Sequence, residues 1–209
     1  MGHRIRGVPP ARRGTVRSRY LHAVARLLYS AITSLDGYVA DADGNFDWAE
    51  PDLEVHAFVN DRERPIGTYL YGRRMYEVMQ AWETLGDEPE APDVARDYAT
   101  LWRAADKVVY STTLDATTTS RTRLERSFDP DAVRAMKATA AADLGIGGPG
   151  LAAHALRAGL VDEISLYLNP IVVGAGTPAL PEQVSVDLVL EYEHRFDNGV
   201  VYLRYRVER

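Results

Sequence analysis

Residues 144–158 read Leu-Gly-Ile-Gly-Gly-Pro-Gly-Leu-Ala-Ala-His-Ala-Leu-Arg-Ala, and this stretch decides the fold class. Its first three residues form a short apolar run that predicts a buried strand. The glycine-rich residues 147–150 predict a tight turn, and residues 151–158 predict a helix that Gly159 ends. A strand that passes through glycines directly into a helix is typical of α/β proteins.

The same alternation extends outward from that stretch in both directions. Apolar runs rich in β-forming residues predict strands at residues 27–33, 68–71 and 107–111 and an edge strand around residues 121–124. Helical spacing predicts helices over residues 52–63, 73–82, 93–105 and 132–142. The C-terminal part is all β, at residues 163–169, 186–196 and 200–207, and Asn198-Gly199 predicts a hairpin turn. We expect one mixed sheet with helices on its faces.

The composition fits one domain and excludes several classes of protein. The 209 residues are 46% apolar and 26% charged, which is ordinary globular usage, and we place one domain at residues 26–209. Cysteine is absent, so disulfides, thiolate nucleophiles, iron–sulfur clusters and Cys-ligated zinc are excluded. The five histidines lack metal-ligand spacing, so we expect no metal. No apolar run approaches the roughly 20 residues of a membrane span, and we expect a cytoplasmic protein without membrane contact.

Charge is divided unevenly along the chain. Residues 1–26 contain seven arginines and no acid, whereas the remainder holds 17 bases against 30 acids. An acidic body repels a phosphate backbone, which argues against nucleic acid as the partner. Because prolines and glycines accompany the arginines, residues 1–25 predict an unstructured basic extension. The alternative is a basic arm that binds nucleic acid.

The glycine motif Gly145-Ile-Gly147-Gly-Pro-Gly150 satisfies the three-glycine pattern of dinucleotide-binding turns. Backbone N–H groups at the start of the following helix could receive a pyrophosphate. A Rossmann site would also have an acid about 20 positions later to hold the ribose, and residues 165–172 contain none. The motif therefore indicates a phosphate-binding turn in a different fold, or a turn that serves packing alone.

Two further motifs have both a functional and a purely structural interpretation. Gly72 precedes Arg73 and Arg74 at a predicted helix start, where the helix dipole disfavours cations unless an anion compensates. The alternative is a pair of solvated arginines. Asp36 follows the first predicted strand, at the sheet edge where ligands bind in open α/β proteins, but an Asp-Gly turn needs no function.

Together these motifs are typical of a known family. They occur in the order Ser34-Leu-Asp-Gly-Tyr-Val39, Gly44-Asn-Phe-Asp-Trp48, Gly72-Arg-Arg-Met-Tyr-Glu77, Lys107-Val-Val-Tyr-Ser-Thr-Thr-Leu114, Ile146-Gly-Gly-Pro-Gly-Leu-Ala-Ala153, Leu160-Val-Asp-Glu163 and Pro170-Ile-Val-Val-Gly174. Over about residues 26–207 the chain resembles the dihydrofolate reductase-like family, in the branch typified by the C-terminal reductase domain of the bifunctional riboflavin-biosynthesis deaminase/reductase.

The resemblance implies a three-layer αβα fold with a mixed, mostly parallel central sheet and an antiparallel C-terminal hairpin, which binds NADPH and forms a homodimer. It implies a cis peptide between Gly147 and Gly148. It implies that Asp36 is catalytic and contacts the substrate, and that Phe46 and Trp48 lie in a mobile loop that closes the substrate pocket. The cofactor-binding residues that it implies are Ala31, Gly72, Arg73, Arg74, Ser111, Thr112, Gly147, Gly148, Pro149, Gly150 and Leu151.

The chain also departs from this family. Met75 stands where the family usually has a threonine whose hydroxyl meets a phosphate, which puts cofactor affinity in question. The zinc deaminase half is missing, since there is no cysteine. We therefore expect an NADPH-dependent reductase of a small heterocycle, aminouracil- or pterin-like, similar to 5-amino-6-(5-phosphoribosylamino)uracil reductase. The alternative is a non-catalytic NADPH- or nucleotide-binding protein of the same fold.

Overall fold

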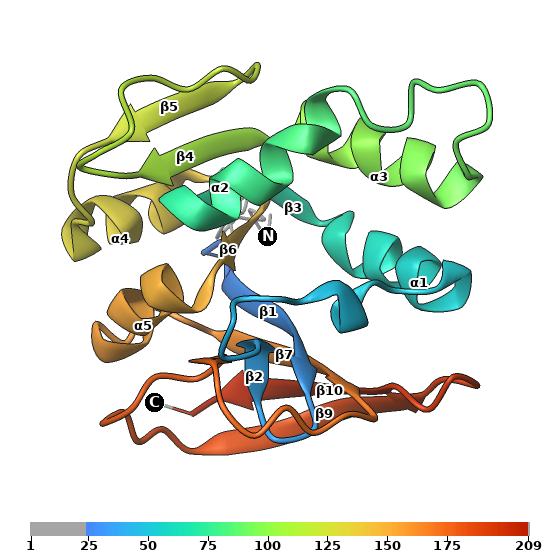
Figure 1. The fold of residues 1–209 in the computed structure, drawn as a ribbon. Helices are drawn as coiled ribbons and strands as arrows, with labels where there is room; N and C mark the ends of the chain where they lie inside the picture. The colour runs from blue at the N-terminus through green and yellow to red at the C-terminus, as the bar shows by residue number, and fades with distance from the viewer. Residues whose placement is uncertain (1–23, 209) are drawn as a thin grey trace, which may run out of the picture.

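An eight-stranded sheet with strand order β5-β4-β3-β6-β1-β7-β10-β9 organises the molecule (Figure 1). The structure is a computed structural model, and it describes residues 24–208. The six strands from β5 to β7 are parallel, whereas β10 is antiparallel to both β7 and β9. The predicted extension, residues 1–25, lies almost wholly outside the described residues. Of its last two residues, Val24 is exposed, while Ala25 is buried in the core.

The strands and helices lie close to the predicted positions. The main sheet comprises β1 (Leu27–Ser34), β3 (Ile66–Gly72), β4 (Asp106–Tyr110), β5 (Thr122–Glu125), β6 (Asp143–Gly147), β7 (Glu163–Asn169), β9 (Leu188–Arg195) and β10 (Val201–Val207). The helices are η1 (Asp47–Ala49), α1 (Leu53–Glu63), α2 (Arg73–Met79), η2 (Gln80–Glu83), α3 (Asp93–Ala104), α4 (Pro130–Thr139) and α5 (Pro149–Arg157). The helix predicted over residues 73–82 is divided, because α2 changes into the 3₁₀ helix η2.

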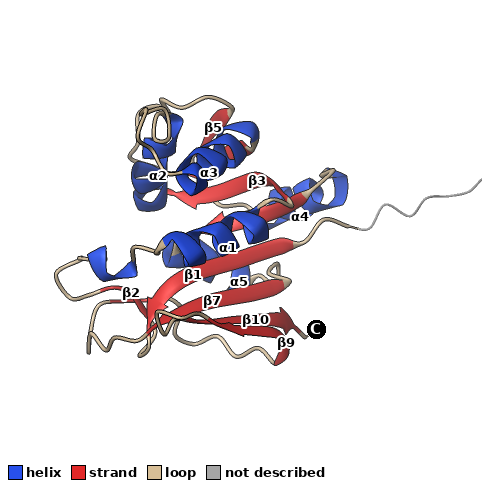
Figure 2. Ribbon diagram, turned by 90° about the vertical axis from the view of Figure 1, so that its right-hand side faces the viewer, coloured by secondary structure: helices blue, strands red, loops and turns tan. Residues whose placement is uncertain are grey.

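The helices cover both faces of the sheet, which confirms the three-layer αβα architecture. Leu27 and Tyr29 of β1 pack in one core with residues of α4 and α5. On the opposite face, Tyr69 and Tyr71 of β3 pack against α2 and α3, and α1 packs against β7 and β10. Figure 1 shows α4 and α5 on the left of the sheet and α1 and α3 on its right, and Figure 2 shows α1 in front of the strands. No helix of the described part is long and apolar enough to cross a membrane.

A second, two-stranded sheet was not predicted. It pairs β2 (Tyr38–Ala40) with β8 (Thr177–Pro178) in antiparallel orientation. These strands are three and two residues long, too short for an alternating pattern to be recognised, and β8 contains a proline. The pair joins the segment after β1 to the segment after β7.

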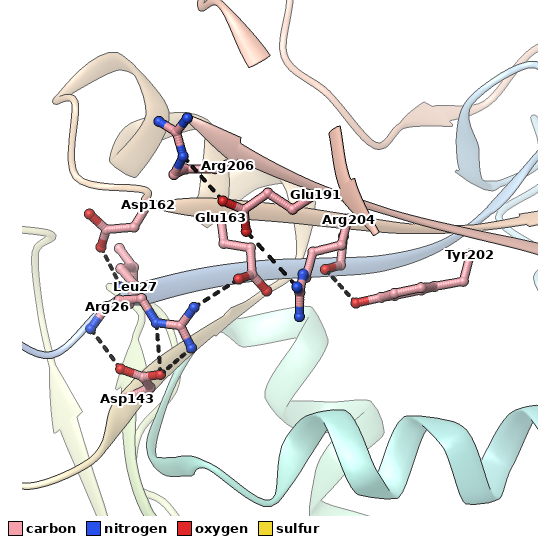
Figure 3. Close-up of polar contacts among 10 residues, drawn as sticks. Arg26, Leu27, Asp143, Asp162, Glu163, Glu191, Tyr202, Arg204 and Arg206 are labelled. Carbon is pink, nitrogen blue, oxygen red and sulfur yellow. Dashed lines mark hydrogen bonds and ion pairs between the residues drawn. The ribbon is translucent and has the colours of Figure 1, made fainter. Parts of the chain in front are cut away.

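Ion pairs and hydrogen bonds connect the amino ends of the parallel strands β1, β6 and β7 (Figure 3). Arg26 bonds the Asp143 carboxylate through its backbone N–H at 2.8 Å and its Nη2 at 2.6 Å, and its Nη1 donates to Glu163 at 2.9 Å. The backbone N–H of Leu27 donates to Asp162 at 2.7 Å. This cluster sets the register of β1, β6 and β7 at one edge of the sheet and leaves the carboxyl-end edge for the candidate site.

Candidate functional site

Four neighbouring parallel strands end at one edge of the sheet, and most of the predicted site residues lie there. Gly72 ends β3 and pairs with Tyr110 at the end of β4, while Tyr71 pairs with Gly147 at the end of β6. Adjacent strands lie about 4.8 Å apart, so residues as distant in the sequence as Tyr71 and Gly147 come within reach of one ligand. Asp36 follows β1, the next strand along the same edge.

The glycine turn between β6 and α5 depends on a positive φ. Gly148 is the N-cap of α5 with φ of 89°, a conformation that side chains of L-residues rarely adopt. Pro149 begins the helix, where the missing N–H costs nothing. A Cβ on Gly150 would meet nothing within 4 Å, so the space beside the first helical turn is open. The turn therefore exposes backbone at a helix N-terminus, as a phosphate site requires.

The cis peptide expected between Gly147 and Gly148 is wrong, because the described part of the chain has no cis peptide bond. The chain changes direction through the positive φ of Gly148 instead. A glycine adopts such a φ readily, whereas a non-proline cis bond costs about 2.5–4 kcal/mol.

Met75 packs directly on this turn. A Cβ on Gly147 would lie 3.1 Å from Met75 Cγ and 2.8 Å from the Tyr71 ring, and a Cβ on Gly148 would lie 3.2 Å from Met75 Cβ. The position where the family has a threonine therefore supports the backbone of the turn by apolar contact. Both positions need glycine for this close approach. The sequence analysis required glycine there only for the conformation of the turn.

The two arginines at the start of α2 differ in their contacts. Arg73 Nε lies 3.1 Å from Glu77 Oε1, and its Nη1 donates to Thr113 Oγ1 at 3.0 Å. Arg74 is exposed and has no hydrogen bond or ion pair with any described residue. Of the predicted pair, Arg74 is therefore the cation available to an anion.

The segment after β4 forms an ordered turn beside these arginines. Ser111 is buried, and its Oγ accepts hydrogen bonds from the N–H groups of Thr113 at 3.2 Å and Leu114 at 2.9 Å. Arg126 Nη1 donates to the Leu114 carbonyl at 2.6 Å. Thr112 projects into solvent at the turn. Ser111 thus shapes the turn that presents Thr112, a supporting role that the sequence did not distinguish from ligand contact.

Beyond Tyr29, β1 has no described strand partner on its β6 side, and we call this unpaired side of residues 30–34 the gap between β1 and β6. β1 pairs with β7 as far as Ser34, but its pairing with β6 ends at Tyr29 opposite Ile146. Because Leu144 N–H donates to the Arg26 carbonyl, the backbone groups of every second residue from Arg26 onward face β6. Ile32 therefore directs its peptide groups toward the gap, while those of Ala31 face β7. The alternation of backbone groups along β1 therefore indicates Ile32 as a candidate for ligand contact, a residue that the sequence motifs did not select. The cofactor role of Ala31 stays a prediction.

The carboxylate of Asp36 accepts hydrogen bonds from the protein backbone. Its two carboxylate oxygens accept the N–H groups of Val173 at 3.2 Å and Gly174 at 2.7 Å, in the loop after β7. The pKa of this exposed carboxyl is lowered, first by a hydrogen bond from the Ser34 hydroxyl and then by these backbone N–H groups. Asp36 is therefore ionised at neutral pH and holds two loops together, and its catalytic and substrate-binding roles stay predictions.

The loop between β2 and α1 carries the other two predicted substrate residues. Phe46 is 47% exposed, and Trp48 lies in η1, with its indole Nε1 buried and without a hydrogen-bond partner. Asp41 Oδ1 accepts the N–H groups of Asp43 at 3.0 Å and Asn45 at 2.8 Å, which orders the loop. Closure of this loop over a substrate stays a prediction. Within residues 24–208, no group of three or more His, Asp or Glu side chains could hold a metal ion.

Comparisons with known proteins agree with this geometry. The family model of the RibD C-terminal domain matches residues 25–202. An uncharacterised Bacillus subtilis protein, YyaP, is 27% identical over 184 residues, which cover 86% of this chain and 94% of that protein. A solved structure from Shewanella sp. PV-4, named for riboflavin biosynthesis, superposes with a TM-score of 0.69 at 21% identity and covers 88% of this chain and 99% of its own. Dihydrofolate reductase from Enterococcus faecalis superposes with a TM-score of 0.56 at 14% identity and covers 88% and 97%.

Proposed function

The chain belongs to the RibD C-terminal domain family, and on that premise we propose that it is a reductase that uses NADPH to reduce a small heterocyclic compound. The observation that carries this proposal is the set of phosphate-binding features at adjacent strand ends. These are the open glycine turn at the end of β6, Arg74 in the first turn of α2, which has no partner among residues 24–208, and the gap beside β1.

The residues of this edge fit the chemistry of NADPH. Its pyrophosphate suits the backbone N–H groups at the start of α5, beside the open space at Gly150. Its additional phosphate suits Arg74 and the exposed Thr112 at the ends of β3 and β4, since a guanidinium binds phosphate through a bidentate fork. The gap between β1 and β6 offers the peptide groups of Ile32 to a flat amide-bearing ring.

Bound NADPH would supply a hydride, and the protein would orient the acceptor and exclude water. In that reaction the peptide groups of Ile32 would fix one ring in the gap, and Met75 with Tyr71 would keep the glycine turn in place. Asp36, ionised and bonded to Val173 and Gly174, would hold the loop after β7 against the β1–β2 turn. A proton required by the acceptor would come from water, because Asp36 carries none at neutral pH.

One observation favours the alternative of a nucleotide-binding protein without turnover. Asp36, the one acidic candidate for proton transfer that the sequence analysis selected, is engaged by the loop after β7. Two measurements separate the alternatives. Saturable enhancement of nicotinamide fluorescence on titration with NADPH supports both, and its absence contradicts both. Oxidation of NADPH at 340 nm in the presence of an aminouracil, a pterin or a flavin supports the reductase, and NADPH binding without any oxidation supports the binder.

We also propose that the protein is a homodimer, as the family resemblance implies. Leu188 and Leu190 on the edge strand β9 are 38% and 45% exposed and lie beside the half-buried Val207 and Tyr205 of β10. An uncovered apolar face of this kind suits contact with a second copy. Light scattering during gel filtration tests the mass, and a monomer would contradict this proposal.

A further inference from the structure

We infer that, unlike the phosphoribosyl-bearing aminouracil to which the sequence resemblance points, the substrate of this site carries no phosphate group and is an uncharged or cationic, largely apolar ring compound. This inference rests on the proposed function, because it concerns the part of the same site that would receive the acceptor. We call that part the substrate end and define it as residues 34–53 and 169–178.

The two segments of the substrate end are held together by several contacts. Leu35 N–H donates to the Ile171 carbonyl at 2.8 Å, and Asp36 bonds the loop after β7 as described above. β2 pairs with β8, and Gly176 lies so close to the Ala40–Asp41 backbone that a Cβ there would be 2.0 Å from the Ala40 carbonyl oxygen. Both segments therefore belong to one surface beside the carboxyl end of β1.

This surface has negative charge and no basic side chain. Residues 169–178 contain no charged residue, and residues 34–53 contain no arginine, lysine or histidine. The six acids of the substrate end are Asp36, Asp41, Asp43, Asp47, Glu50 and Asp52. The carboxylate of Asp36 is satisfied by backbone N–H groups, whereas Asp43, Asp47, Glu50 and Asp52 are exposed. A phosphate monoester carries close to two negative charges at neutral pH and would be repelled here.

Two basic side chains of the carboxyl-end edge, Arg74 and Arg195, belong to elements outside these two segments. Arg74 lies in the first turn of α2, directly after β3. β3 is two strands from β1, so the two strands are about 10 Å apart at the usual strand spacing. In the other direction, Arg195 ends β9, three strands from β1, and the neighbouring His194 stacks on Phe58 with a centroid distance of 5.4 Å. These basic side chains therefore lie two or three strands away from β1 on either side, outside the substrate end.

The helix that begins at the substrate end is not open to an anion either. Asp52 caps α1 by accepting the Val55 N–H at 2.9 Å, and it also accepts Asn198 Nδ2 at 2.8 Å. Glu54 adds a second carboxylate in the first turn of α1. A helix N-terminus that is occupied by its own carboxylate is not available to a phosphate.

The remaining surface of the substrate end is apolar or neutral. Leu35 and Val172 are 61% and 66% exposed, and Phe46, Leu53 and Ile171 are also exposed. The buried polar atoms there that lack a hydrogen-bond partner are the Trp48 Nε1 and, at the end of β1 just before this surface, the Thr33 Oγ1. Both groups are uncharged, so they add no positive charge to this region.

The test is a titration of the ¹⁵N-labelled full chain with inorganic phosphate at constant ionic strength, followed by backbone amide chemical shifts. We expect saturable shifts at residues 72–74 and 147–152 and none at the substrate end. The same titration of Asp47→Lys, which reverses one exposed charge, is expected to produce shifts at the substrate end. Glu90→Lys, which reverses an exposed charge in the loop before α3, is the matched control and is expected to behave as the wild type.

A second arm compares riboflavin with its phosphate ester FMN on the NADP⁺-loaded protein. We expect FMN to perturb the amides of the substrate end no more than riboflavin does. Saturable phosphate shifts there in the wild type, or at least tenfold tighter binding of FMN than of riboflavin, would overturn the inference. NADPH fluorescence tests the proposed function separately, so a chain that binds NADPH and also phosphate at the substrate end would lose this inference alone.

Discussion

At the scale of single residues, neighbours with the same chemistry have different roles. Arg73 and Arg74 are adjacent arginines, yet Arg73 is bonded to Glu77 and Thr113, and Arg74 is unpaired among the described residues. Likewise, Gly148 requires a positive φ and touches Met75, whereas Gly150 faces open space. The sequence predicted both motifs but could not rank their members, since the ranking depends on contacts with Glu77, Thr113 and Met75.

We predict that Arg74→Ala weakens NADPH binding by about 10- to 100-fold, because a hydrogen bond to a charged group contributes about 1.5–3 kcal/mol. The loss for NADH is expected to be smaller, since NADH lacks the additional phosphate. Arg73→Ala is the matched control and is expected to lose much less, because Glu77 already compensates the charge of Arg73. Nicotinamide fluorescence titrations of the wild type and both variants measure the affinities for NADPH and NADH. Equal losses of NADPH affinity in Arg73→Ala and Arg74→Ala would contradict the assignment of Arg74.

We predict that Gly148→Ala both destabilises the fold and removes NADPH binding. A Cβ in this sparsely populated backbone conformation, with φ of 89° and ψ of 129°, costs about 1–3 kcal/mol, and it would lie 3.2 Å from Met75 Cβ. Thermal melting with and without saturating NADPH measures both effects. Gly150→Ala is the control for stability, and we expect it to melt at or above the wild-type temperature. A Gly148→Ala protein that melts as the wild type and keeps the NADPH-induced rise would refute the role of this turn.

At the scale of elements, loops distant in sequence are fixed by backbone contacts. Asp36 and Gly174 are 138 positions apart, and their hydrogen bond joins the turn after β1 to the loop after β7. The sequence predicted the strands on each side, because β1 and β7 have long apolar runs. It could not predict β2 and β8, or the engagement of Asp36, because these depend on how the two loops meet.

We predict that Asp36→Ala increases hydrogen exchange at the amides of Val173 and Gly174 by at least tenfold at neutral pH, whereas Asp36→Asn, with one acceptor oxygen, has an intermediate effect. The pKa of Asp36 is lowered below its ordinary value of 3.8 in the folded protein. Its stabilising contribution is therefore present at pH values above 3.8 and lost as the pH falls through the lowered value. Protection of these amides after correction for intrinsic rates should be constant from pH 5 to 8. Unchanged exchange in Asp36→Ala would show that the loop does not depend on this carboxylate.

Glu63, at the end of α1, makes the stability of the protein depend on pH in the direction opposite to Asp36. Burial raises the pKa of the Glu63 carboxyl to about 7 from its ordinary 4.5, and a hydrogen bond with Tyr69 lowers it in part. The folded protein therefore holds this proton more tightly than the unfolded chain does. The contribution of Glu63 to stability is full below pH 4.5 and is lost as the pH rises through 7.

We predict that Glu63→Gln makes the protein more stable than the wild type at pH 8.5, by at most about 3 kcal/mol, and nearly equal to it below pH 4.5. Urea unfolding at a series of pH values measures the difference. Glu54→Gln changes an exposed carboxylate on the same helix, and we expect its stability difference from the wild type not to increase with pH. Parallel profiles for the wild type and Glu63→Gln would contradict the burial of this carboxyl.

At the scale of the whole molecule, the two edges of the parallel sheet have different tasks. The amino-end edge is fastened by Arg26 and its acidic partners, and the carboxyl-end edge carries the glycine turn, Arg74 and the acidic substrate end. The α/β alternation predicts a ligand site at the carboxyl-end edge, because ligands bind at the carboxyl ends of parallel strands, but it did not predict the ion pairs at the amino ends. The position of Ile32 in the gap beside β1 could not be predicted, since it depends on the register between β1 and β6.

The central claim is that NADPH binds across the carboxyl ends of β4, β3, β6 and β1. The most direct test is amide hydrogen exchange of the full chain with and without saturating NADPH. We predict slower exchange at residues 72–76, 111–114 and 147–153, with unchanged exchange in α4 and along β9. Slower exchange confined to other segments, or no change with NADPH at any concentration, would contradict the claim.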